Sequence, residues 1–298
     1  MKRWIRRSLW AATTLVAVAG AAVVAGDELA DLKMNRRVEL ASAPFALRSG
    51  ADALERGRHL YASRGCTDCH GRDGAGRVFV DDGRGLKLAG PNISPGPGSV
   101  VANYRAVDWE HTLRHGVKPD GRPLMIMPSE DYNRLTDADT AAIVAYVRSL
   151  APAAGGRAVL ELPLPVRVLS GLGMIEDAAA RIDHRLPPAE PVPEGVTPGH
   201  GRYVAAMCQG CHGPQLAGGR VPGAPPDWPD AARLAPGPGS ALARYPDADA
   251  LLAMFRSGHR PDGSPVRVMP FESLGAMSEV DVRALYLYLK TLPAPARG

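Results

Sequence analysis

Two five-residue stretches decide the fold of this chain: Cys66-Thr67-Asp68-Cys69-His70 and Cys208-Gln209-Gly210-Cys211-His212. Together they hold all four cysteines, and in each a histidine follows the second cysteine. Residues i, i+3 and i+4 share one face of a helix, so a single turn can present two thiols and an imidazole to one bound group. This C-x-x-C-H pattern is typical of covalent c-type haem attachment. We therefore predict two covalently bound c-type haems, whose porphyrins bond to Cys66, Cys69, Cys208 and Cys211 and whose irons bind His70 and His212.

Other uses of paired cysteines fit the spacing less well. A Cys₄ zinc ribbon has about 15–20 residues between its C-x-x-C pairs, whereas 138 residues separate Cys69 from Cys208. A thioredoxin-like redox pair or a disulfide framework would not require a histidine after each second cysteine. Haem attachment accounts for both histidines and leaves no thiol for a disulfide.

The two motifs lie within a longer internal repeat. Cys66 and Cys208 are 142 residues apart, and the same shift relates matching residues on both sides of them. The matches include Gly57 with Gly199, Tyr61 with Tyr203, Pro119-Asp120-Gly121 with Pro261-Asp262-Gly263, Met127-Pro128 with Met269-Pro270, and Tyr146 with Tyr288. We infer two homologous haem domains, residues 52–152 and 197–293.

The sixth iron ligand determines what each haem can do. An iron bound by histidine alone is open to substrates or gases, whereas a methionine thioether on the other side makes it an electron carrier. Met125 and Met127 compete for this role in the first domain. The repeat aligns Met127, but not Met125, with a second methionine, Met269, and both follow their haem histidine by 57 residues. We predict Met127 and Met269 as ligands to iron, with His115 and His259 as the alternatives.

Each repeat shows the apolar patterns and end signals of a few short helices. The expected ranges are 52–66, 107–115 and 136–150 in the first repeat, and 197–208, 248–257 and 278–292 in the second. So little helix cannot bury itself, and aromatic residues make up only 5% of the chain. We therefore expect an all-α fold in which the haems complete the cores.

The N-terminus carries an export signal. Four cations, Lys2, Arg3, Arg6 and Arg7, precede an uncharged apolar stretch from Ser8 to Ala25. Its length suits a membrane-spanning helix with the body of the protein outside the cytoplasm, and small residues near its end also allow a cleaved signal peptide. We expect residues 1–26 to form a signal or, preferably, an inner-membrane anchor, followed by a linker over 27–51.

The remaining segments are a second linker, residues 153–196, and a tail, residues 294–298. The second linker has proline-rich ends and an apolar middle, for which we predict a helix over about 166–185. Its position makes it a strap between the two domains.

The charge distribution excludes nucleic acid as a partner. The formal net charge is +4, and the four N-terminal cations account for all of it. A nucleic-acid-binding domain would need a basic patch on its folded body.

The motifs, the repeat and the paired Met-Pro sites resemble the class I, mitochondrial-type c-type cytochromes, in the tandem diheme form of bacterial electron-transfer subunits. The resemblance covers about residues 52–152 and 197–293. It implies that a glycine and an aromatic residue meet where the first and last helices of each domain cross, and that a proline carbonyl orients each haem histidine. The matching residues are Gly57 with Tyr146, Gly199 with Tyr288, Pro91 for His70, and Pro229 for His212, where the second repeat otherwise departs into Ala231-Ala232-Arg233.

The expected function is single-electron relay in the bacterial periplasm, on the outer face of the inner membrane. The donor would be a periplasmic dehydrogenase or a membrane quinol oxidoreductase, and the acceptor another cytochrome or a terminal oxidase. An electron carrier is not itself an enzyme. The alternatives are a diheme peroxidase, which needs one iron open to peroxide, and a redox or gas sensor, which needs an output domain.

Overall fold

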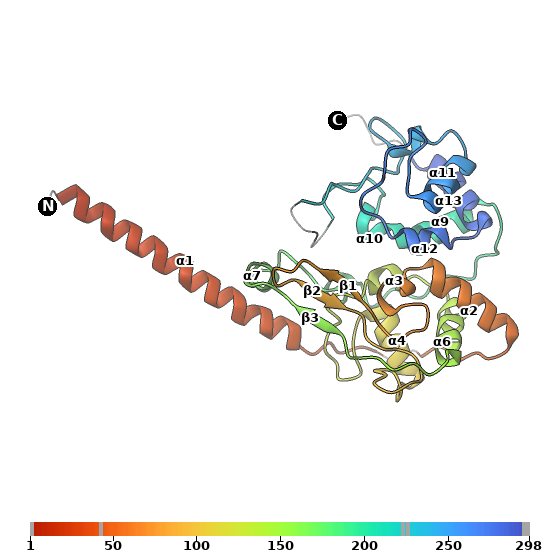
Figure 1. The fold of residues 1–298 in the computed structure, drawn as a ribbon, viewed down its shortest axis with the longest axis horizontal. Helices are drawn as coiled ribbons and strands as arrows, with labels where there is room; N and C mark the ends of the chain where they lie inside the picture. The colour runs from red at the N-terminus through yellow and green to blue at the C-terminus, as the bar shows by residue number, and fades with distance from the viewer. Residues whose placement is uncertain (1–2, 42–43, 222–223, 225–226, 294–298) are drawn as a thin grey trace.

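The computed structural model describes residues 3–41, 44–221, 224 and 227–293, so the expected tail 294–298 lies outside the described residues. Two helical bodies lie against each other, and the long helix α1 (Arg3–Asn35) projects from one side (Figure 1). The fold is mainly helical, as the sequence predicts.

The first body is built on two crossed helices, α2 (Ala51–Ser63) and α6 (Asp137–Ser149). The helix α6 begins after Thr136, whose hydroxyl accepts a hydrogen bond from the Asp139 amide and so caps the first turn. A Cβ at Gly57 would lie 2.0 Å from the Ala142 carbonyl oxygen and 2.7 Å from the Tyr146 Cβ, so only glycine allows this crossing. The expected pairing of Gly57 with Tyr146 is confirmed. The other helices of this body are α3 (Cys66–His70), α4 (Ala106–His115) and α5 (Ser129–Tyr132).

The second body repeats this crossing with α9 (Pro198–Ala205) and α13 (Glu279–Thr291). Here the expected glycine is wrong, because Gly201 and not Gly199 lies at the contact. A Cβ at Gly201 would be 1.9 Å from the Ala284 carbonyl oxygen and 2.7 Å from the Tyr288 Cβ. The remaining elements are η1 (Ala206–Cys208), α10 (Gln209–His212), η2 (Ala241–Arg244), α11 (Ala248–Ser257) and α12 (Phe271–Gly275).

The offset between the two crossings arises just before the haem motifs. In the first body Gly65 adopts a left-handed conformation, with φ 89°, between α2 and α3. Its counterpart in the repeat, Met207, lies in the 3₁₀ turn η1. Nine residues lead from Gly57 to Cys66, but only seven lead from Gly201 to Cys208, so the two domains connect the crossing to the haem motif by different turns.

A small antiparallel sheet, which the sequence did not predict, joins the linker to the first body. Its strands are β1 (Val78–Asp81), β2 (Lys87–Ala89) and β3 (Val159–Glu161), in the order β1-β2-β3. The expected helix over 166–185 is two short helices, α7 (Leu164–Gly171) and α8 (Ala178–Arg181). Gly173 separates them with a φ of 80°.

Candidate functional site

The first haem motif forms α3, and its histidine is held by one hydrogen bond. His70 Nδ1 donates to the Pro91 carbonyl oxygen at 3.0 Å, so the expected role of Pro91 is confirmed. With Nδ1 engaged, Nε2 is the nitrogen left to bind a metal. Burial lowers the pKa of His70, which favours the neutral imidazole that iron requires.

The second motif has the same arrangement with a different partner. His212 Nδ1 donates to the Ala232 carbonyl oxygen at 2.7 Å, so the expectation for Pro229 is wrong. The acceptor is a backbone carbonyl, which any residue can supply, so the search for a proline could not find it. Burial lowers the pKa of His212 as well.

The four cysteines of the motifs are free thiols in this structure, and burial shifts their pKa values. Burial raises the pKa of Cys66 and of Cys208 to about 12, and that of Cys69 to about 11. Such thiols are not activated as nucleophiles or as thiolate ligands. Within the described part of the chain, no three His, Cys, Asp or Glu side chains are placed to hold a metal ion directly.

An open cavity of about 190 Å³ lies in the first body, beside the segment that holds His70. Ile93, two residues after Pro91, is part of its lining, which mixes apolar and aromatic side chains with polar ones such as Ser94, Ser99 and Arg148. The residues that line it include Ile93, Val101, Tyr104, Trp109 and Val147. None of Cys66, Cys69, His70 and Met127 lines this cavity, so the argument for a c-type haem rests on the donor set of two thiols and an imidazole.

The two candidate methionine ligands lie in equivalent places. Met127 packs against the same apolar cluster as Cys66, and Met269 against the same cluster as Cys208. Pro128 and Pro270 follow the two methionines and are the N-cap residues of α5 and α12. The alternative ligand His115 has both ring nitrogens engaged, with Glu110 and His184, and His259 bonds to the carbonyl of its neighbour Ser257.

Comparisons with known proteins agree with this geometry. The family model Cytochrome c matches residues 54–151, and the model Cytochrome C oxidase, cbb3-type, subunit III matches residues 194–289. The chain is a tandem class I c-type cytochrome.

Similar proteins are cytochrome subunits. The chain is 29% identical to the fructose dehydrogenase cytochrome subunit of Gluconobacter japonicus, over 83% of this chain and 54% of that protein. It is 27% identical to the gluconate 2-dehydrogenase cytochrome c subunit of Pantoea cypripedii, over 82% of this chain and 60% of that protein. A diheme cytochrome c-type of Cereibacter sphaeroides is 26% identical over 97% of this chain and 99% of its own length. The cytochrome thus spans only about half the length of the first of these relatives.

The cytochrome carries two covalently bound c-type haems, and its cytochrome c domains indicate an electron carrier. The relatives are cytochrome subunits of dehydrogenases and a diheme cytochrome, and they give the peroxidase alternative no support.

The two haem-attachment helices of the cytochrome lie at the interface between the domains, and each contacts the other domain. Asp131 on α5 of the first domain accepts a hydrogen bond from the Gly210 amide at 3.0 Å. Ser273 on α12 of the second domain donates to Asp68 Oδ2 at 2.6 Å. The 142-residue shift relates Asp68 to Gly210 and Asp131 to Ser273, so the interface is reciprocal.

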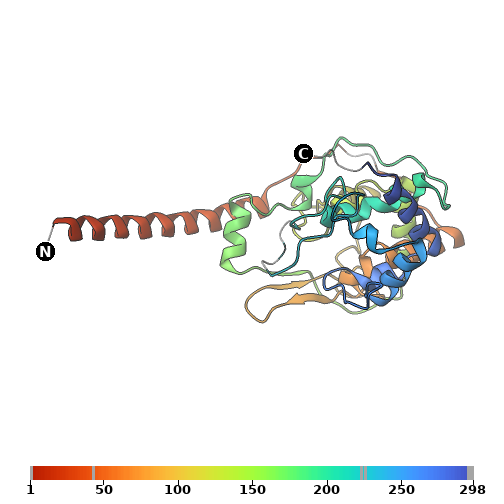
Figure 2. The same cartoon turned by 90° about the horizontal axis from the view of Figure 1, so that it is seen from above.

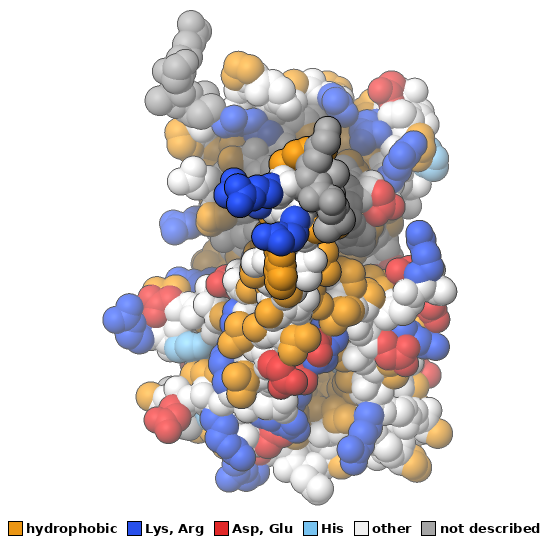
Figure 3. All heavy atoms as spheres, turned by 90° about the vertical axis from the view of Figure 1, so that its left-hand side faces the viewer, with side chains coloured by type: hydrophobic (Ala, Val, Ile, Leu, Met, Phe, Trp, Pro, Cys, Tyr) orange, Lys and Arg blue, Asp and Glu red, His pale blue; other side chains and the backbone are white. Residues whose placement is uncertain are grey.

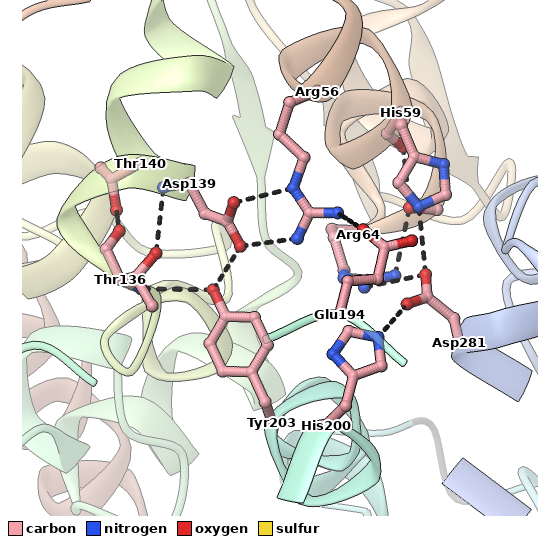
Figure 4. Close-up of polar contacts among 11 residues, drawn as sticks. Arg56, His59, Arg64, Thr136, Asp139, Thr140, Glu194, His200, Tyr203 and Asp281 are labelled. Atoms are coloured by element: carbon pink, nitrogen blue, oxygen red, sulfur yellow. Dashed lines mark hydrogen bonds and ion pairs between the residues drawn. The ribbon is translucent and has the colours of Figure 1, made fainter. Parts of the chain in front are cut away.

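A second set of contacts across the interface is centred on Asp281, in the first turn of α13 (Figure 4). Asp281, fully buried on α13, accepts hydrogen bonds from His59 at 3.0 Å, Arg64 at 3.1 Å and His200 at 2.8 Å. Burial alone would raise the pKa of Asp281, but His59, Arg64 and His200 hold it well below its usual range.

Asp139, the counterpart of Asp281 in the repeat, has the matching role in the first domain. It pairs with Arg56 and accepts a hydrogen bond at 2.6 Å from the hydroxyl of Tyr203, across the interface. Tyr61, which matches Tyr203 in sequence, instead packs on Tyr146 inside its own domain. Sequence reasoning missed these acids, although the repeat shift relates Asp139 to Asp281 and could have indicated them.

Proposed function

We propose that this cytochrome takes single electrons from a periplasmic or membrane-bound dehydrogenase or quinol oxidoreductase and passes them to a respiratory acceptor, a cytochrome or a terminal oxidase. One haem belongs to residues 52–152 and the other to residues 197–293. The first is held by Cys66, Cys69, His70 and Met127, and the second by Cys208, Cys211, His212 and Met269. The dehydrogenase subunits among the relatives support a dehydrogenase as donor.

The observation that carries the relay is the reciprocal contact of the two haem-attachment helices. The helix α3 contacts α12, and α10 contacts α5. Both porphyrins are bonded to these helices in this proposal, so both lie next to the same interface. An electron that enters one domain then has a short route into the other.

The protein's own residues hold this arrangement still. A bound haem supplies an iron that gains or loses one electron. The backbone acceptors of His70 and His212 fix the orientation of each imidazole, and the apolar clusters around Cys66 and Cys208 exclude water. The buried contacts of Asp281 keep the two domains from separating.

The location follows from α1, which we propose remains as an inner-membrane anchor with the haem domains in the periplasm. Its segment Arg6–Asn35 is long and apolar enough to cross a membrane, and its apolar part is almost entirely exposed. The cations that precede Ser8 place the N-terminus on the cytoplasmic side.

The relay can be tested in membranes that contain the holoprotein. Substrates of candidate dehydrogenases, and separately a quinol, are added while the reduced haem bands are followed. The proposal predicts that at least one donor reduces both haems, and that the rate of this reduction is higher than the turnover rate of the acceptor. Reduction of one haem only, with peroxide consumed catalytically, would favour the peroxidase alternative.

The double variant Cys208→Ala with Cys211→Ala separates the two haems. It should keep one covalent haem per chain, still accept electrons or still deliver them, and lose the complete relay. A variant that relays at the normal rate would show that the haems do not work in series.

A further inference from the structure

The short helix α7 lies across α1 and is fixed to it. A Cβ at Gly171 would lie 1.8 Å from the Gly26 carbonyl oxygen, so the two backbones are in direct contact. Arg167 pairs with Asp27 and with Asp31, the latter at 3.0 Å. Lys33 Nζ donates to the Ser170 carbonyl oxygen at 3.1 Å. These contacts fix the position of α7 along the axis of α1.

That level coincides with the end of the apolar part of α1. The uncharged stretch from Ser8 to Ala25 has 18 residues, which at about 1.5 Å per residue spans about 27 Å. A bilayer has a hydrocarbon core of about 30 Å. Gly26 and Asp27, which contact α7, therefore lie at the boundary between hydrocarbon and headgroups.

The direction of α7 suits the same boundary. In Figure 2, α7 runs across α1 instead of along it, so it lies near the plane of the membrane when α1 crosses it. In Figure 1, α7 is on the side of the body from which α1 projects.

One side of α7 and the turn after it are apolar and uncovered. Val168 and Gly171 face α1, whereas Leu169 is 36% exposed, Leu172 56% and Met174 69%. The nearby Arg167 is neutralised by its two aspartates. Figure 3 shows this side of the molecule, with hydrophobic side chains along α1 and around its base.

We propose that α7 is a second membrane contact, in which Leu169, Leu172 and Met174 enter the outer leaflet of the bilayer at the headgroup level. This inference rests on the proposed anchoring of α1. Helices that lie in this plane bury their apolar side at the boundary between headgroups and acyl chains. The partner that covers the apolar side of α7 is the lipid surface, because the contacts with α1 already hold α7 at that surface.

The contact has a consequence for electron transfer. The strand β3 leads into α7 after two residues and pairs with β2 of the first domain. A single spanning helix lets the body tilt and rotate, whereas α7 and β3 together fix the first domain against the membrane. The surfaces that redox partners contact then lie at a fixed distance from the membrane and in a fixed orientation to it.

The test uses the full-length holoprotein in vesicles of phosphatidylcholine and phosphatidylglycerol. The native cysteines are bonded to haem in this account, so Leu172→Cys provides a single thiol for a nitroxide label. The matched control is Leu287→Cys, on α13 of the second domain, where the native side chain is 37% exposed. Power saturation under nitrogen gives the background relaxation from the irons, and oxygen and a water-soluble nickel complex then report lipid and water exposure.

The proposal predicts a several-fold higher ratio of oxygen to nickel accessibility at position 172 than at position 287. Equal ratios at the two positions would overturn it, and so would a label at 172 that is shielded from both reagents, which indicates a protein partner such as a second copy. Flotation of the same vesicles tests the anchor separately: protein that fails to float refutes the anchor, whereas floating protein with a water-exposed label refutes only the role of α7.

Discussion

Asp131 and Ser273 occupy the same position in the two halves of the repeat, and each forms a hydrogen bond with the haem-attachment helix of the other domain. Asp131 accepts from the Gly210 amide, and Ser273 donates to Asp68. The segments that carry the proposed methionine ligands thus also build the interface between the domains. We therefore expect a change in one haem site to affect the neighbouring one.

Asp131 should make the potential of the second haem depend on pH. Burial raises the pKa of Asp131 to about 7, with Glu130 adding to the shift and the Gly210 amide and Arg181 opposing it. The carboxylate that forms as the pH rises favours ferric iron, so the potential of the second haem should fall as the pH increases through about 7.

Redox titration at several pH values measures this dependence. Asp131→Asn should remove it, and the exposed Asp183→Asn should not. A pH dependence that persists in Asp131→Asn would assign the effect to another group.

Asp281 should be essential for the stability of the paired domains. Its replacement by Asn leaves Arg64 buried without a carboxylate, which typically costs about 3–5 kcal/mol in the free energy of unfolding. The control is Asp249→Asn, which removes an exposed ion pair with Arg283 and should cost less than about 1 kcal/mol. Denaturant unfolding of the holoprotein compares them, and equal losses would contradict the role of Asp281.

The same residue predicts a loss of stability in acid. The pKa of Asp281 is lower in the folded protein than in the unfolded chain, so its contribution is complete above the ordinary aspartate pKa of about 4 and is lost as the pH falls below it. Unfolding at pH 7 and at progressively lower pH should show a smaller decrease in Asp281→Asn than in the wild type. Parallel decreases would show that other carboxylates control the acid response.

Gly201 and Gly199 offer a matched test of the helix crossing in the second domain. Gly201→Ala forces a Cβ against the Ala284 carbonyl and should cost at least about 1–3 kcal/mol. Gly199→Ala meets only the Thr197 hydroxyl at 3.9 Å and should be neutral or slightly stabilising, because alanine favours a helix over glycine by about 0.5–1 kcal/mol. Thermal unfolding should separate the two variants, and the reverse order would place the crossing at Gly199.

The haem motifs, the repeat and most helix ends could be predicted from the sequence, because each depends on local chemistry. Thr136 and Ser278 cap the helices that the sequence predicts to begin at these positions, and Gly116 and Gly258 end α4 and α11 in the left-handed conformation.

What the sequence missed depends on contacts between distant segments. The partner of His212 is a backbone carbonyl that carries no residue signature. The strand β3 forms only because the linker passes beside β2. The crossing lies at Gly201 and not at Gly199 because the chain enters the second haem motif through a different turn, for which no residue pattern gives a signal.

The most direct test of the electron-carrier account is the binding of carbon monoxide to the reduced full-length protein, because this ligand needs a vacant sixth position on the iron. If Met127 and Met269 both bind iron, the wild-type spectrum should not change at neutral pH. Met127→Ala should open the first haem and lower its potential, since a thioether favours ferrous iron, and Met269→Ala should do the same at the second haem. Met125→Ala should do neither. Carbon monoxide bound at one haem of the wild type, or a response of Met125→Ala like that expected of Met127→Ala, would contradict the account.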